Sequence, residues 1–208
     1  MSAHTVRYFS FSALYHDVCK PDTKTIDENG RIRFFNHDVQ GADVAAERAR
    51  LFNLSNDEIE RLHIIIKHHM RIHSFASKLE NENELPTRKA IYRFFRDSGK
   101  AGIDLILLAL ADMRGTRDKD LTIKTWNMYL DISRILLENY FEKPEEVIAP
   151  PRLVDGNDLM KELNIQPGPQ VGQLLEAIRE NQAEGNIQTR AQALEFAKAE
   201  IKNKVPQD

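Results

Sequence analysis

Apolar residues recur at helical spacing along most of this chain, and this periodicity limits the fold more than any other feature. A capping box at Ser55 and Glu58 opens one helix, whose apolar stripe runs on to Ile66. Pro21 stops an earlier helical segment over residues 9–19. Further helices are predicted over about residues 39–52, 55–70, 87–97, 101–113 and 121–141. We therefore predict an all-α fold, a helical bundle with a small C-terminal helical extension.

Two stretches interrupt the helical pattern. Residues 22–36 are mostly polar, and Asn29-Gly30 followed by a short apolar run predicts a hairpin-like turn. Three prolines between residues 144 and 151 break any regular element and indicate a boundary. The predicted domain organisation is a first domain over residues 1–143, a proline-rich linker over 144–157 and a small C-terminal helical region over 158–208.

The composition is that of an ordinary globular protein. Of the 208 residues, 41% are hydrophobic, enough for a packed core, and 29% are charged. A net charge of -3 argues against a protein that coats nucleic acid or an anionic membrane. The longest apolar run is too short to span a bilayer, and the N-terminus lacks the pattern of a secretory signal. The single cysteine, Cys19, cannot form an internal disulfide and fits a reducing cytoplasm, the localisation that we predict.

His16 and Asp17 stand side by side at the end of an apolar run, and this pair is the strongest chemical signal in the sequence. Burying an imidazole and a carboxylate costs several kcal/mol unless partners compensate. The two side chains can both reach one divalent cation, or they belong to a dense network of hydrogen bonds. The first alternative makes the protein a candidate enzyme.

Further histidines offer nitrogen ligands, and each has a simpler alternative explanation. His37 lies on a loop or in the first turn of the next helix, where a cap or an exposed histidine is equally expected. His69 shares the inward stripe of its helix with Ile65 and Ile66, whereas His68 lies nearer the polar edge. Because a histidine on an apolar face is more often a hydrogen-bonded core residue than a ligand, both alternatives stay open at this point.

Asp112 ends an apolar run that predicts a buried helix, which is an unusual place for a carboxylate. It is either paired with Arg114 or Arg117, or it shares a cation with the His16-Asp17 pair. Two carboxylates and three imidazoles suit borderline divalent metals better than calcium, and we predict one or two ions drawn from Mn, Fe, Ni, Co, Zn and Mg. Such a cation activates bound water and polarises a phosphoryl oxygen.

Several segments together resemble a known family. The stretch from Leu14 to Pro21, with the His16-Asp17 pair inside it, resembles the signature of HD-superfamily metal-dependent phosphohydrolases. A longer series resembles one branch, the HD-containing C-terminal region of bacterial CCA-adding tRNA nucleotidyltransferases and poly(A) polymerase-like proteins. Its members are Lys20-Pro-Asp-Thr23, Phe35-Asn-His37, Gly41-Ala42, Lys67-His-His-Met70, Tyr92-Arg-Phe-Phe95 and Leu110-Ala-Asp112.

This resemblance implies an all-α HD domain with a metal centre. The implied ligands are His16, Asp17 and Asp112 at one position and Asp17, His37 and His69 at a second. Asp17 would also orient the nucleophile, and Lys20 would contact a substrate phosphate as a point charge.

The sequence departs from the family pattern in several ways. The family supplies an additional histidine ligand from upstream of the pair, and His4 is a poor replacement, because one helix joining it to His16 would separate the two by about 18 Å. Cys19 occupies a place where the branch usually has glycine. The paired carboxylates of a nucleotidyltransferase domain are missing from these residues, so we expect no nucleotide addition by them.

Two hypotheses about function follow. The first is a metal-dependent phosphohydrolase acting on a phosphate ester, such as a nucleotide or a 2′,3′-cyclic phosphodiester. The alternative is a catalytically degenerate module, derived from a tRNA nucleotidyltransferase, that binds RNA or a separate nucleotidyltransferase. Its basic residues would meet a phosphate backbone, or they form only a solvated face; they are Arg88, Lys89, Arg93 and Arg96.

Overall fold

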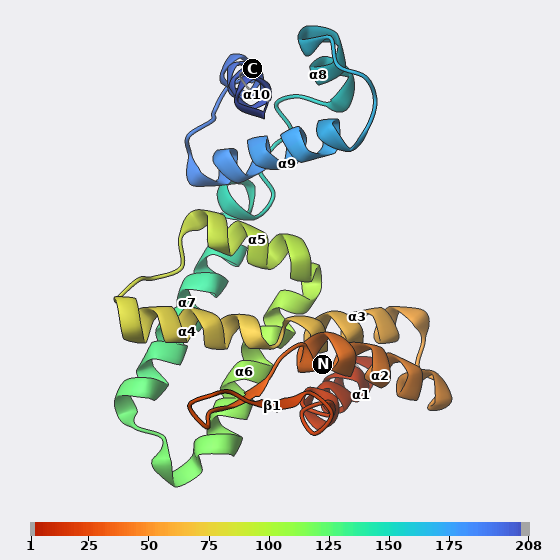
Figure 1. Ribbon diagram of the computed structural model, residues 1–208, viewed down its shortest axis with the longest axis vertical. Coiled ribbons are helices and arrows are strands. Elements are labelled where there is room, and N and C mark those ends of the chain that lie inside the picture. The colour runs from red at the N-terminus through yellow and green to blue at the C-terminus, as the bar shows by residue number, and fades with distance from the viewer. Residues whose placement is uncertain (1–2, 205–208) are drawn as a thin grey trace. The chain divides into compact units, whose positions relative to one another are not determined.

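The computed structural model describes residues 3–204 of the chain and the side chains of residues 7–203. Helices dominate it (Figure 1), so the predicted all-α fold is confirmed. The strands of the described range form one two-stranded sheet. The chain divides into two compact units: unit 1 comprises Met1–Leu85 and Asp97–Arg134, and unit 2 comprises Pro86–Arg96 and Ile135–Asp208.

Unit 1 contains the N-terminal helices and the apolar helix that ends near Asp112. Its elements are α1 (Ala3–Tyr15), β1 (Lys24–Ile26), β2 (Ile32–Phe34), α2 (His37–Leu51), α3 (Asn56–His68), α4 (Met70–Glu82), η1 (Gly99–Ala101), α6 (Gly102–Arg117), η2 (Asp118–Asp120) and the first part of α7 (Ile123–Glu142). Helices α1, α2 and α3 contact one another, and α6 contacts α1, α3 and α4.

Helix α2 packs closely against α3 because its inner face carries small side chains. Ala42, Ala45 and Ala49 are fully buried, and a Cβ added at Gly41 would lie 3.6 Å from the side chain of Ile66 on α3. Such a close approach of two helices lets side chains at their ends meet in a confined space. The first residue of α2 and the residue after α3 are both histidines.

The N-terminus of α3 has the predicted capping box. The Ser55 side chain accepts a hydrogen bond from the Glu58 backbone, and the Glu58 side chain accepts one from the Ser55 backbone. At the other end, His69 keeps helical angles (φ -59°, ψ -29°), and α4 begins at the next residue. Helix α4 was not predicted from the sequence, and in the structure only Ile72 and Ala76 of its residues are buried.

Helix α1 ends earlier than expected from the sequence. It stops at Tyr15 rather than continuing to residue 19, and the chain turns tightly, with the Val18 N–H donating to the Tyr15 carbonyl and the Lys20 N–H to the Asp17 carbonyl. These short-range bonds replace the helical ladder before Pro21 is reached. The predicted hairpin follows, with β1 and β2 antiparallel and Gly30 in the left-handed region at φ 75°.

Unit 2 has a hydrophobic core of its own. Its elements are most of α5 (Arg88–Ser98), the last part of α7, the π-helical turn η3 (Pro144–Ile148), α8 (Gly156–Leu163), α9 (Pro169–Glu184) and α10 (Arg190–Lys204). The centre of the core is fully buried, with Leu159 on α8, Ile178 on α9 and Ala197 on α10 in one cluster.

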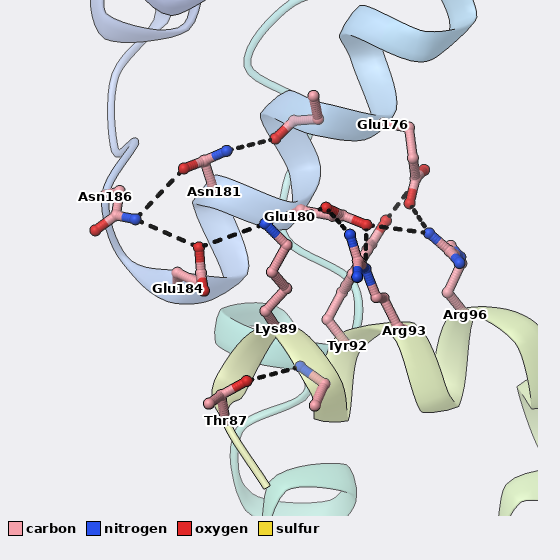
Figure 2. Close-up of polar contacts among 12 residues, drawn as sticks. Thr87, Lys89, Tyr92, Arg93, Arg96, Glu176, Glu180, Asn181, Glu184 and Asn186 are labelled. Carbon is pink, nitrogen blue, oxygen red and sulfur yellow. Dashed lines mark hydrogen bonds and ion pairs between the residues drawn. The ribbon is translucent and has the colours of Figure 1, made fainter. Parts of the chain in front are cut away.

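Acidic residues of α9 pair with basic residues of α5 in unit 2 (Figure 2). Arg93 forms a two-pronged ion pair with Glu180, at 2.5 and 2.7 Å. Lys89 lies 3.3 Å from the same carboxylate, and Arg96 pairs with both Glu176 and Glu180. The basic face that the sequence offered to a nucleic acid is therefore largely engaged within the protein.

The domain boundaries predicted from the sequence, at residues 143 and 157, remain a prediction. The compact units do not follow them, because unit 2 also takes in residues 86–96 and 135–143. The predicted linker over 144–157 contains η3, whose Val147 is fully buried. Among the described helices, none has the length and apolar character needed to cross a bilayer.

Candidate metal centre

All five side chains predicted as metal ligands lie together in unit 1. His16 and Asp17 come from the turn after α1, His37 opens α2, His69 joins α3 to α4, and Asp112 lies on α6. The His16 Nε2 atom is 3.4 Å from Asp17 Oδ2 and 3.5 Å from Asp112 Oδ1. These contacts join residues that are up to about a hundred positions apart in the sequence.

Asp17, His37 and His69 form a group that could hold a metal ion. Asp17 Oδ1 lies 3.5 Å from His37 Nε2 and 3.6 Å from His69 Nε2, and the two Nε2 atoms are 3.2 Å apart. A point equidistant from the corners of a triangle with these sides is about 2.0 Å from each atom, which is the length of a bond from zinc to nitrogen or oxygen. The spacing of the three donor atoms therefore fits a small divalent cation.

The histidines of the cluster are oriented by the backbone. The Nδ1 atoms of His16, His37 and His69 lie 3.0, 2.7 and 2.7 Å from the carbonyl oxygens of Ala13, Phe34 and Ile66. A carbonyl oxygen only accepts, so each Nδ1 carries its hydrogen and each Nε2 atom is directed at the centre, where it offers a lone pair once it carries no proton. Metal-binding histidines are commonly fixed in this way.

Without a cation, the cluster would be poorly compensated. His16 Nε2 and Asp17 Oδ1 are buried, and neither forms a hydrogen bond with the described residues. The Nε2 lone pairs of neutral His37 and His69 face each other at 3.2 Å. Buried polar atoms are normally satisfied, and exceptions concentrate at functional sites. The types and positions of these donor atoms therefore fit a bound metal ion.

The electrostatics of the centre favour a positive occupant. Burial opposes ionisation of Asp17, but the imidazoles of His16 and His69 and the Lys20 ammonium outweigh it and hold the pKa of Asp17 far below its usual range. His16 and His73 likewise hold the pKa of Asp112 well below its usual value. Burial alone would lower the pKa of His16, yet the two carboxylates raise it to about 10. Two ionised carboxylates therefore attract a proton or a metal cation to this point.

Contacts in unit 1 bear on the alternatives that the sequence left open for Asp112 and for the histidine pair. Within the described residues, Asp112 pairs with His16 and His73, whereas Arg114 lies over the Trp126 ring at 5.3 Å. His69 is almost fully buried in the cluster, whereas the neighbouring His68 is only half-buried and lies outside the group of potential ligands.

His73 is a member of the site that sequence reasoning missed. Its Nε2 lies 3.4 Å from Asp112 Oδ2, and its Nδ1 lies 2.7 Å from the Tyr129 hydroxyl. Burial raises the pKa of Tyr129 to about 12, so this hydroxyl stays protonated and can donate to Nδ1. The hydrogen of neutral His73 is then on Nε2, directed at the carboxylate, so His73 positions Asp112. His73 follows His69 by four residues, and this spacing could have indicated that the two side chains lie on the same face of a helix.

Lys20 lies at the edge of the centre. Its Nζ is 2.6 Å from Asp17 Oδ2 and 5.7 Å from the centre of the Phe34 ring, and its side chain is 37% exposed. Cys19 is buried and does not need the left-handed backbone that glycine permits. The side chain of His4 lies outside the described side chains, although α1 places its backbone at the end of the helix opposite His16.

Comparisons with known proteins give a consistent picture. A family model described as tRNA nucleotidyltransferase domain 2 matches residues 50–197. A CC-adding tRNA nucleotidyltransferase from Thermus thermophilus is 34% identical over 188 residues, which are 89% of this chain and 38% of the relative. An A-adding tRNA nucleotidyltransferase from Deinococcus radiodurans is 30% identical over 189 residues, 89% of this chain and 40% of the relative.

A CC-adding tRNA nucleotidyltransferase from Synechocystis is 30% identical over 158 residues, 75% of this chain and 33% of the relative. The chain thus spans between 33% and 40% of the length of these relatives. No solved structure gave a significant match.

Proposed function

This chain belongs to the tRNA nucleotidyltransferase domain 2 family, and we propose that it acts as a metal-binding, tRNA-handling module in the addition of nucleotides to tRNA. The observation that carries the proposal is the triangle of donor atoms formed by Asp17, His37 and His69. The family supplies the RNA context, since the relatives are named for adding nucleotides to tRNA.

The residues of the centre have separate tasks in this proposal. Asp17 Oδ1 and the Nε2 atoms of His37 and His69 would hold a divalent cation. His16 and Asp112 would hold a second ion or tighten the first site. A cation held there supplies Lewis-acid polarisation of a phosphoryl oxygen and lowers the pKa of a bound water. Because the ligands come from α2, the joint between α3 and α4, and the turn after α1, a bound ion would also stabilise the packing of these helices.

The metal part of the proposal is tested by comparing two adjacent histidines. His69→Ala removes a donor atom of the triangle, whereas His68→Ala removes a half-buried imidazole outside it. Elemental analysis of the purified proteins should give about one transition-metal ion or more per wild-type chain, the same for His68→Ala, and strongly reduced metal for His69→Ala. Equal metal content in all three proteins, or none in the wild type after exposure to Mn, Ni and Zn, contradicts the proposal.

The RNA part is tested with a tRNA that lacks its terminal CCA and with the complete tRNA. We expect binding of the wild-type chain to be measurable by fluorescence anisotropy and to weaken as salt rises, since phosphate contacts release counterions. The absence of binding to either tRNA at low salt would contradict this part while leaving the metal result intact.

A second candidate function is hydrolysis of a phosphate ester at the same centre by HD-type chemistry. The specific observation that favours it is Lys20, whose ammonium reaches the edge of the donor cluster. A half-exposed ammonium beside a cation site could contact one phosphate oxygen while the cation contacts another. Asp17 would hold the ion and accept a hydrogen bond from the attacking water. The substrates of choice are nucleotides and 2′,3′-cyclic phosphodiesters.

This second candidate makes a separate prediction. Under Mn or Ni, the wild type should release phosphate from such esters, and Asp17→Ala should abolish the activity while the far-ultraviolet circular dichroism stays helical. Lys20→Met should raise KM more than it lowers kcat, because the ammonium would contact the substrate rather than the reacting water. Hydrolysis that survives the loss of Asp17 would refute it.

A further inference from the structure

Unit 2 contains a pocket of about 330 Å³ with an unusual distribution of charge. Its lining includes Arg96 from α5, Arg179 from α9 and Arg152 from the segment between η3 and α8. No acidic side chain of the described residues lines it, although the chain as a whole carries a net charge of -3. Apolar atoms of residues 148–150 and the Tyr92 ring complete the wall.

Two of these arginines have no ionic partner among the described side chains. Neither Arg152, which is exposed, nor Arg179, which is half-buried, forms an ion pair within the part of the chain that the structure describes. By contrast, the neighbouring basic residues Arg93 and Lys89 both form ion pairs with Glu180 (Figure 2). Gathering like charges around one hollow raises the free energy of the protein unless an anion is bound there.

Arg96 and Tyr92 give the pocket a fixed wall. Arg96 pairs with Glu176, and its guanidinium lies 6.0 Å from the centre of the Tyr92 ring. Burial and the nearby Glu176 raise the pKa of Tyr92 to about 12, so its hydroxyl stays neutral. This side of the pocket is therefore preorganised, whereas Arg152 and Arg179 have their donor groups available for a ligand.

We propose that this pocket binds the phosphate group of a nucleotide, with Arg152 and Arg179 as its direct ligands. Guanidinium groups match phosphate oxygens in two-pronged hydrogen bonds, and one phosphate has enough oxygens to accept such bonds from two guanidinium groups. The volume is in the range of small-ligand sites, and the apolar wall beside the arginines offers a surface for a sugar or a base. The nucleotide is either a free mononucleotide or one unit of an RNA strand.

The proposal uses no residue of the metal centre, although its RNA arm rests on the proposed tRNA function. The experiment measures binding of three probes to the full chain in excess EDTA: a short fluorescein-labelled single-stranded RNA, AMP and inorganic phosphate. The variants are Arg179→Ala and Arg152→Ala. Lys198→Ala serves as a matched control, because it removes one exposed positive charge from α10 of the same unit.

We expect Arg179→Ala and Arg152→Ala each to weaken nucleotide binding about tenfold, as loss of one charge-assisted hydrogen bond does. For RNA, each should also reduce the slope of log affinity against log salt by about 0.7. Lys198→Ala should change neither quantity. An effect on AMP and RNA alike identifies a mononucleotide site, and an effect on RNA alone identifies a site for a strand.

Three results would overturn the proposal: no binding of any probe, equal losses in the Lys198→Ala control, or binding of inorganic phosphate without AMP or RNA. Because Arg152 is exposed in a segment outside the helices, its variant keeps the test valid if Arg179→Ala fails to fold. Metal content measured on the same protein preparations before EDTA is added separates a failure here from a failure of the metal centre.

Discussion

Replacing Glu180 by glutamine tests how the α5–α9 contact in unit 2 is stabilised. The Glu180 side chain is 10% exposed and accepts two hydrogen bonds from Arg93, at 2.5 and 2.7 Å. Lys89 and Arg96 contribute two further cationic contacts at 3.3 and 3.4 Å. Glutamine keeps the shape of the side chain but leaves three basic groups of α5 facing one neutral amide.

The magnitude follows from this geometry. Losing a charge-assisted hydrogen bond costs about 1.5–3 kcal/mol when its partners are buried. The two bonds from Arg93 would together give about 3–6 kcal/mol. The Arg93 side chain is 47% exposed, so solvent screens the pair and reduces the effect to about 2 kcal/mol. For a chain of this size, that loss corresponds to a fall in Tm of about 4–8 °C.

The assay is thermal unfolding followed by circular dichroism, with Glu184→Gln as the control. Glu184 lies one turn further along α9. Its carboxylate is 4.0 Å from the Lys89 ammonium, a long and weak ion pair, and 30% of its side chain is exposed, so its loss should cost less than about 0.5 kcal/mol. If Glu180→Gln lowers the Tm no more than Glu184→Gln does, the ion pair does not stabilise unit 2 and the reasoning is wrong.

The pH dependence provides an independent check on the same variant. The hydrogen bonds from Arg93 outweigh burial and, with Lys89, lower the pKa of Glu180 below its usual value of 4.5. A carboxylate whose pKa is lowered by folding contributes stability above its unfolded pKa and loses it as the pH falls through the folded pKa. The difference in Tm between wild type and Glu180→Gln should therefore be full at pH 7 and shrink below about pH 4.

Three further changes test other parts of the molecule. Tyr129→Phe removes the hydroxyl that orients His73. Competition with a chelator should then show that the metal affinity falls by up to about 10-fold, while the fold is unchanged. Ser55→Ala removes one half of the capping box of α3 and should cost about 1 kcal/mol in urea unfolding. Ile178→Ala opens a cavity in the fully buried core of unit 2 and should cost about 3 kcal/mol by the same measurement.

Features set by a few neighbouring residues were predictable from the sequence. The capping box at Ser55 and the hairpin around Gly30 depend on local chemistry, and the structure has both. The end of α1 was not predictable in the same way. Pro21 marks the last place where the helix could stop, but the turn at His16 forms earlier, where the pair meets side chains from α2 and α6.

Contacts between distant residues mark the limit of sequence reasoning. The two-pronged pair between Arg93 and Glu180 joins positions 87 residues apart, and nothing near Arg93 indicates which carboxylate it meets. His73 was missed for a related reason. Its alignment with His69 on one face requires the backbone to stay helical through the α3–α4 joint, which the local pattern did not indicate.

Glu180 in unit 2 and Asp17 in unit 1 differ in how their carboxylate oxygens are hydrogen-bonded, and this contrast bears on function. Glu180 in unit 2 has cationic donors on both oxygens, as expected where a carboxylate serves stability. Asp17 in unit 1 keeps Oδ1 without a hydrogen bond among the described residues, although the Nε2 atoms of His37 and His69 lie 3.5 and 3.6 Å from it. A folded chain can satisfy such an atom by a small rotation of one ring, yet the backbone carbonyls fix each ring through Nδ1 and keep its Nε2 atom directed at the centre. The Nδ1 atoms of these rings are hydrogen-bonded, whereas Asp17 Oδ1 is left without a hydrogen bond among the described residues. A cation that binds between Asp17 Oδ1 and the Nε2 atoms best explains this difference.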